Sequence, residues 1–228
     1  MKRIFICLVV TLVVIAAFAQ KDVTTFLGIP VDGTKSAMKQ KLIAKGYVPK
    51  KSGNAEYLEG EFNGTDVHIF IGTNNNKVYR IMVCDANRQN VADIRTRFNR
   101  LVNQFKNNKR YFAFEDYTLS ETEDISFNMT VKDKKYQALF YQLPDMEKVD
   151  TLAFQEQAKQ EMLKKYTPAQ LESPTEEILQ EVKTTTTRMA IELLEKKPVW
   201  FVISEHYGQY YITMYYDNEY NHANGEDL

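Results

Sequence analysis

The spacing of apolar residues follows a helical repeat in two places. Met38 and Leu42 lie four positions apart, between Thr34, a candidate N-cap, and Gly46, which suits the left-handed position after a helix. A longer stripe with helical spacing lies within residues 90–108 and consists of Val91, Ile94, Phe98, Leu101, Val102 and Phe105. Both patterns predict amphipathic helices.

Between these helices the apolar repeat changes to every second residue, which is typical of strands. Three strands are predicted, at 57–62, 65–71 and 78–84. Asn63 and Gly64 join the first two strands, and an Asn-Gly pair is a strong hairpin signal. Residues 20–86 are therefore predicted to form one unit, in which a helix precedes three antiparallel strands.

The order of a helix followed by strands recurs in residues 87–220, which we predict to form a second unit. Its strands are expected at 111–114, 125–131, 136–143, 199–204 and 209–216. Residues 145–197 contain no glycine and are rich in Glu, Lys, Gln, Thr and Leu, so we predict a helical insertion there. The sequence thus predicts an α+β fold: two helix-plus-antiparallel-sheet units in tandem, a helical insertion in the second, and a polar tail at 221–228.

The first 19 residues have a different pattern. Lys2 and Arg3 precede an apolar run at 4–17, and an Ala-x-Ala site follows. This arrangement predicts a secretory signal peptide cleaved between Ala19 and Gln20. The alternative is a membrane anchor, but the run is short for a spanning helix, which needs about 20 residues. We expect the mature chain in the periplasm or at the outer cell surface, with no transmembrane segment.

Charge and cysteine content narrow the function classes. Loss of Lys2 and Arg3 with the leader changes the formal net charge from −1 to −3, which argues against a nucleic-acid-binding protein. Cys84 is the only cysteine left after the leader, so the mature chain cannot form an intramolecular disulfide. Its apolar neighbours predict a buried core thiol, and a reactive thiol is the alternative.

No catalytic residue, cofactor or metal site is predicted. His68, His206 and His222 lie in unrelated segments without the spacing of zinc ligands. The chain has no G-x-S-x-G, no P-loop and no G-x-G-x-x-G. These absences do not exclude an enzyme, but they leave no residue that the sequence marks as catalytic.

Two groups of side chains are candidates for a binding surface. Arg95, Arg97 and Arg100 on the second helix suggest a basic face for an anionic lipid, glycan or partner, or else a solvated face balanced by acids elsewhere. The last hairpin has aromatic residues on both faces, among them Trp200, Tyr211 and Tyr215. One face must belong to the core. The other suggests a platform for a sugar or peptide, unless helices such as the insertion cover it.

Two segments carry a family resemblance: FLGIPVDGTKSAMKQKLIAKGY near the start of the mature chain and YYITMYYDNEYNHANGEDL at the end. They resemble secreted proteins of Bacteroides-type bacteria, a group with no assigned activity. If that resemblance holds, the triplet from Asp150 to Leu152 is similar to the periplasmic O-glycosylation motif of that phylum, with Thr151 as the acceptor. The helix-and-strand order is also similar to the tandem folds of β-lactamase-inhibitor proteins and of small outer-membrane-assembly lipoproteins.

The sequence favours a non-catalytic binding or accessory protein of the cell envelope, with an envelope protein or a glycan as partner. The alternative is a hydrolase acting on envelope or dietary polymers, and a third class is a purely structural envelope protein. A carboxylate pair or histidine network in a deep pocket would favour the hydrolase, and an aromatic sheet face poor in carboxylates would favour binding. The sequence makes no prediction of oligomeric state.

Overall fold

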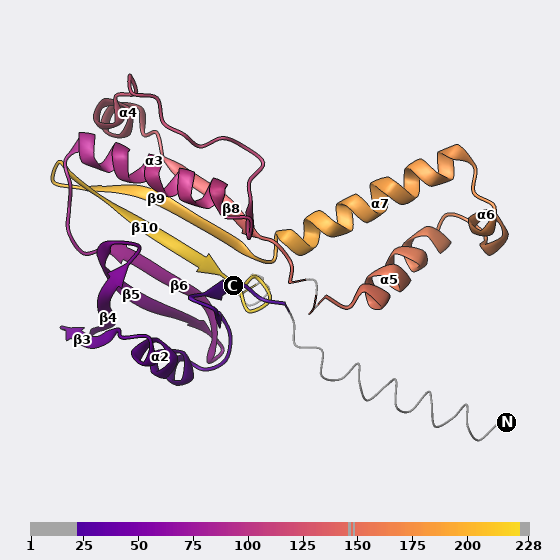
Figure 1. The fold of residues 1–228 in the computed structure, drawn as a ribbon, viewed down its shortest axis with the longest axis horizontal. Helices are drawn as coiled ribbons and strands as arrows, with labels where there is room; N and C mark the ends of the chain where they lie inside the picture. The colour runs from indigo at the N-terminus through magenta and orange to yellow at the C-terminus, as the bar shows by residue number, and fades with distance from the viewer. Residues whose placement is uncertain (1–21, 146, 148, 224–228) are drawn as a thin grey trace. The chain divides into compact units, whose positions relative to one another are not determined.

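The computed structural model describes residues 22–223 except residues 146 and 148 (Figure 1). The chain divides into two compact units. The sheet unit comprises residues 23–143 together with the described residues from 194 onward, and the helical unit comprises Asp22 and the described residues of 144–193. The predicted signal peptide and its cleavage site, Ala19–Gln20, lie outside the described residues.

The sheet unit is built on one antiparallel sheet of eight strands in the order β3-β4-β5-β6-β10-β9-β8-β7. The strands are β3 (Val48–Ser52), β4 (Ala55–Phe62), β5 (Thr65–Asn74), β6 (Lys77–Asp85), β7 (Tyr111–Phe112), β8 (Gln137–Gln142), β9 (Pro198–His206) and β10 (Gln209–Asp217). A separate two-stranded hairpin, β1 (Thr25–Phe26) and β2 (Ile29–Pro30), precedes them. The α+β class with antiparallel sheets is therefore confirmed, while the tandem arrangement of two units stays a prediction.

One face of the sheet is covered by helices. Helices α2 (Lys35–Ala44) and α3 (Val91–Asn107) contact strands β5, β6 and β10. Their apolar residues form one core cluster with alternate residues of the strands. The cluster includes Met38 and Leu42 from α2 and Phe98 and Leu101 from α3. The apolar stripes predicted for these helices thus face the core.

Local signals explain why both helices begin where they do. The Thr34 side chain accepts a hydrogen bond from the Ala37 amide at 3.2 Å, and Gly46 follows α2 with φ +99°. Asn90 caps α3 by accepting from the amides of Ala92 and Asp93, both at 2.9 Å. The two predicted helices are confirmed. Each begins directly after the residue whose side chain caps it.

The hairpin turns are equally local. Asn63 and Gly64 have φ values of 57° and 72°, the left-handed pair that a two-residue turn of type I′ requires. The hairpin predicted there is confirmed. Strand β5 extends through an irregularity at Gly72 to Asn74, so the next turn is shorter than expected.

Residues 125–131 form a helix, so the strand predicted there is wrong. Helix α4 (Ile125–Lys132) begins where the Asp124 side chain accepts from the Phe127 amide at 3.0 Å. It ends at Asp133, which has a left-handed backbone with φ 52°. Ile125 and Met129, one helical turn apart, both pack on the core. Caps at both ends and this apolar pair outweigh the strand preference of the β-branched residues.

The helical unit contains α5 (Thr151–Leu163), α6 (Pro168–Glu172) and α7 (Glu176–Leu194). Its buried side chains include Ala158, Met162, Ile178 and Met189. No helix of the described residues is long and apolar enough to cross a membrane.

Candidate functional site

The sheet face that α2 and α3 do not cover carries a continuous row of half-buried apolar side chains. Cross-strand pairing in register joins these residues from β8 to β5, and the Phe70 ring then lies 5.7 Å from the Tyr57 ring on β4. In strand order the row is Leu139, Trp200, Tyr215, Met82, Phe70 and Tyr57. We call these six residues the aromatic row.

The centre of the aromatic row is held by a polar clamp. The rings of Trp200 and Tyr215 stack with centroids 3.9 Å apart and an interplanar angle of 13°. The Arg80 guanidinium lies 4.9 Å from the centroid of the Tyr215 ring. The Asp217 carboxylate accepts from Trp200 Nε1 at 2.9 Å, from Arg80 Nε at 2.6 Å and from Arg80 Nη2 at 2.8 Å. The two rings are therefore fixed in orientation before any ligand arrives.

The clamp also decides the charge of this surface. The Asp217 side chain is 3% exposed and the Arg80 side chain 26% exposed, so the positive group is the accessible one. The hydrogen bond to Asp217 raises the pKa of Arg80 above its ordinary value, so the guanidinium keeps its positive charge. The two charges compensate each other, and the centre of the row is close to neutral.

Tyr211 lies on the same face as the row. It is half-buried on β10 and pairs with Ser204 on β9. The three aromatic residues proposed from the sequence, Trp200, Tyr211 and Tyr215, thus share one face of the sheet: Tyr211 and Tyr215 by alternation along β10, and Trp200 by pairing with Tyr215.

Cys84 lies on this face and not in the core that the sequence predicted. It is half-buried and is the cross-strand partner of His68. The thiol accepts from the Thr213 hydroxyl and donates to the Asp85 carbonyl, each at 3.6 Å, and no hydrogen bond joins it to His68. Burial raises the pKa of Cys84, which favours the unreactive thiol.

The three predicted arginines have three different environments, and the prediction for Arg97 needs correction. Arg97 is 2% exposed, and it pairs inside the core with Asp85 through bonds of 2.9 Å and 2.7 Å. It lies three residues after Ile94 and four before Leu101, so its place on the apolar stripe was the signal that could have revealed its burial. Arg97 therefore has no part in an exposed basic face.

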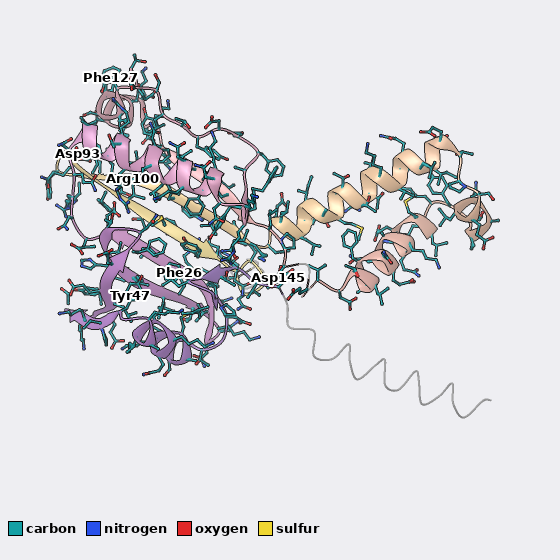
Figure 2. The ribbon with its side chains drawn as sticks, viewed as in Figure 1. Phe26, Tyr47, Asp93, Arg100, Phe127 and Asp145 are labelled. Carbon is teal, nitrogen blue, oxygen red and sulfur yellow. The ribbon has the colours of Figure 1, made fainter. Side chains whose placement is uncertain are left out.

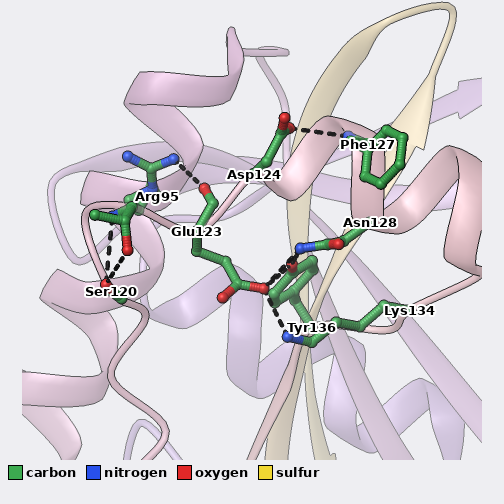
Figure 3. Close-up of polar contacts among 9 residues, drawn as sticks. Arg95, Ser120, Glu123, Asp124, Phe127, Asn128, Lys134 and Tyr136 are labelled. Atoms are coloured by element: carbon green, nitrogen blue, oxygen red, sulfur yellow. Dashed lines mark hydrogen bonds and ion pairs between the residues drawn. The ribbon is translucent and has the colours of Figure 1, made fainter.

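Arg95 binds the chain itself. Its guanidinium donates to the carbonyls of Glu121 and Glu123, and so fixes the loop before α4. Figure 3 shows the bond to Glu123. Arg100 is exposed on α3 (Figure 2) and makes no ion pair with the described residues. Arg95 and Arg100 line one groove of about 780 Å³ along α3, whose other lining residues include Asn99, Asn103 and Glu121.

The loop beside Arg95 is locked by Glu123 (Figure 3). One carboxylate oxygen accepts from Lys134 Nζ at 2.6 Å, from Asn128 Nδ2 at 2.9 Å and from the Tyr136 hydroxyl. Lys134 and Tyr136 lower the pKa of Glu123 through these bonds. All of these donors belong to the protein, so the network stabilises α4 and its connection to β8.

A second concavity of about 450 Å³ lies where the C-terminal half of α3 meets the β4–β5 turn. No pattern in the sequence reveals it, because its residues come from five separate segments. The lining residues, which we call the tyrosine pocket, are Leu27, Tyr47, Glu61, Phe62, Asn63, Gln104, Phe105, Asn108, Tyr111 and Tyr216.

Thr151 is exposed and is the first residue of α5. The Asp150 side chain caps this helix by accepting from the Ala153 amide at 2.9 Å. O-glycosylation of Thr151 stays a prediction.

Within the described part of the chain, no group of three or more His, Cys, Asp or Glu side chains is placed to hold a metal ion. Comparison of the chain with protein-family models, curated proteins and solved structures gave no match.

Proposed function

We propose that this chain is a non-catalytic binding or accessory protein of the cell envelope, which docks on another protein through the aromatic row. Its export is inferred from the N-terminal pattern of Lys2 to Ala19. The observation that supports docking is the continuous row across six strands, with Trp200 and Tyr215 clamped by Asp217 at its centre.

The composition of the row favours a protein partner. Protein interfaces are enriched in aromatic residues, Met and Arg, and depleted of other charges at their centre. The row consists of four aromatic residues, one Met and one Leu, and the neighbouring charge of Arg80 is neutralised by Asp217. Six adjacent strands at a spacing of about 4.8 Å make the row roughly 24 Å long, which suits one side of a standard interface.

The ring geometry is less suited to a glycan. A sugar packs its apolar face on the flat face of an aromatic ring. Trp200 and Tyr215 turn ring faces toward each other, and Arg80 occupies further space over Tyr215. Much of the flat aromatic surface therefore contacts other side chains of the protein, and little of it is left for the flat face of a sugar.

The surroundings of the row give little support for hydrolysis. A nucleophile needs an adjacent base, and Cys84 hydrogen-bonds to Thr213 and the Asp85 carbonyl instead of to His68. Asp217, the carboxylate at the centre of the row, is engaged by three donors. These contacts favour binding over the hydrolase alternative.

Site-specific photo-crosslinking in the exporting cells tests this proposal. A photoreactive residue replaces Tyr211 beside the row or, as a control, the exposed Lys41 on α2. We expect one reproducible protein adduct from position 211 and none from position 41. Y57E should abolish the adduct, whereas F127E on exposed α4 should leave it.

Equal adducts from both positions, no adduct, or adducts of glycan or lipid mass only would contradict a protein partner on this face. An adduct with a second copy of the chain would show that this face mediates self-association and does not bind a different protein. Circular dichroism of each variant shows whether a lost adduct reflects lost binding or lost fold.

A further inference from the structure

We infer that the tyrosine pocket is a binding site for a neutral carbohydrate unit. The pocket lies among residues of α3, the β4–β5 turn and the core side of the sheet, away from the aromatic row. This inference is therefore independent of the docking proposed above. Its volume, about 450 Å³, lies in the range of small-molecule sites, about 300–1,000 Å³.

The pocket has aromatic walls. Phe62, Phe105, Tyr111 and Tyr216 line it, and the Phe105 and Tyr111 rings lie 4.7 Å apart in an edge-to-face pair. Phe105 and Tyr216 are only 8% and 4% exposed and form the back of the pocket. Phe62 and Tyr111 are half-buried, so their rings offer the accessible aromatic surface for the C–H groups of a pyranose ring.

The rim of the pocket offers amide groups with unused hydrogen-bonding capacity. Asn63 Nδ2 donates to Gln104 Oε1 at 2.6 Å, which links the β4–β5 turn to α3. The bond leaves the Gln104 amino group and the Asn63 carbonyl oxygen without partners in the described residues. Asn108 Oδ1 accepts from the Arg110 amide at 3.1 Å, which leaves the Asn108 amino group free to donate. Donors and an acceptor thus surround the aromatic walls, as recognition of hydroxyl groups requires.

The tyrosine hydroxyls add neutral polar groups. Tyr47 donates to the Glu61 carbonyl at 3.0 Å, and the Tyr111 hydroxyl accepts from Gln142 Nε2 at 3.1 Å. A hydrogen bond also joins Tyr111 to Tyr216. Burial raises the pKa of all three tyrosines above the ordinary value, so none becomes an anion near neutral pH.

The charge of the lining excludes other ligand classes. Among the described residues that line the pocket there is no Lys, Arg or His, and Glu61 is the one carboxylic acid. An anionic ligand would therefore find no cationic side chain among these lining residues, and a purely apolar ligand would leave the rim amides unpaired. A neutral ligand with hydroxyl groups and an apolar ring face can pack on the aromatic walls and hydrogen-bond to the rim amides.

The pocket is built before a ligand binds. Leu27 forms part of its wall at the β1–β2 turn, with φ 52° and 38% exposure. The turn is anchored because Gln142 Oε1 accepts from the Thr25 amide at 2.8 Å and Gln142 Nε2 donates to the Thr25 carbonyl at 2.7 Å. Because the walls are already ordered, binding loses less conformational entropy of the protein.

Saturation-transfer NMR on the mature chain tests the inference. The probes are glucose, galactose and N-acetylglucosamine, with glucuronic acid as the matched anion. We expect transfer to at least one neutral sugar and little to glucuronic acid. Titration then gives the affinity of each variant for the sugar that binds.

Two substitutions at the exposed Gln104 locate the site. Q104W should fill the pocket and abolish transfer, and Q104A should weaken binding about tenfold, equivalent to roughly 1.4 kcal/mol. N103W and N103A, at the neighbouring exposed residue outside the pocket, should bind like the parent chain.

No transfer to any neutral sugar, stronger transfer to glucuronic acid, or equal binding by Q104W and N103W would overturn the inference. Because Gln104 lies on α3, on the sheet face opposite the aromatic row, these variants should leave the crosslink from position 211 intact. Failure of one proposal is thereby distinguishable from failure of the other.

Discussion

The buried pair of Arg97 and Asp85 should be a main determinant of the stability of the sheet unit. Arg97 Nε and Nη2 reach the two carboxylate oxygens at 2.9 Å and 2.7 Å, and the two side chains are 2% and 0% exposed. One carboxylate oxygen also accepts from the Ile212 amide at 3.2 Å. The pair thus joins α3, the end of β6 and the middle of β10.

Replacement of Arg97 by methionine leaves the Asp85 charge buried without its partner. Removal of one member of such a pair costs about 3–5 kcal/mol, a large part of the roughly 5–15 kcal/mol that stabilises an ordinary domain. R97M/D85N removes both charges, and the new amide can still accept from the Ile212 amide. We therefore expect the double variant to be more stable than R97M alone.

Urea unfolding of the mature chain, followed by circular dichroism, measures both effects. The matched control is R100M, at an exposed position of the same helix, which should change the free energy of unfolding by less than about 0.5 kcal/mol. If R97M costs less than about 1 kcal/mol, or if D85N fails to rescue it, the reasoning about a buried charge is wrong.

Three further predictions concern other groups. The hydrogen bond from Lys134 lowers the pKa of Glu123 in the folded protein. Ionised Glu123 therefore stabilises the fold at any pH above its pKa in the unfolded chain, about 4.3. This stabilisation is lost as the pH falls through the lower pKa of the folded state. The stability difference between the parent and E123Q should therefore be present at neutral pH and disappear in acid, and pH-independent differences in urea unfolding would contradict the cause. W200F puts a smaller aromatic ring in place of the indole and removes the donor to Asp217, and should cost about 1.5–3 kcal/mol by the same assay; an unchanged stability would show that Arg80 alone satisfies the carboxylate. Exported parent chain should carry added hexose by intact mass and T151A should not; equal masses apart from the substitution would reject Thr151 as an acceptor.

Sequence predicted the parts of the fold whose causes are local. Thr34 and Asn90 cap helices that begin one residue later, and Asn63-Gly64 makes its own turn. Strand β3 was missed because all five of its residues are exposed, so it has no apolar alternation to detect. Helix α4 was mistaken for a strand because its β-branched residues favour a strand, while its caps, Asp124 and Asp133, lie just outside the segment.

The candidate sites depend on contacts that no local pattern specifies. Alternation places Tyr215 on one face of β10, and Met82 on one face of β6, but the aromatic row exists only because these two strands pair in one register. A shift of one residue in that pairing would set Tyr215 beside a residue of the opposite face and would separate Arg80 from Asp217, which are direct partners in the observed register. The clamp of Trp200, Arg80 and Asp217 therefore favours the same register that assembles the row, since this alignment makes Arg80 and Asp217 direct cross-strand partners. On this argument the polar clamp has two roles, because it specifies how the halves of the sheet join and it presents the rings that we propose as the docking surface.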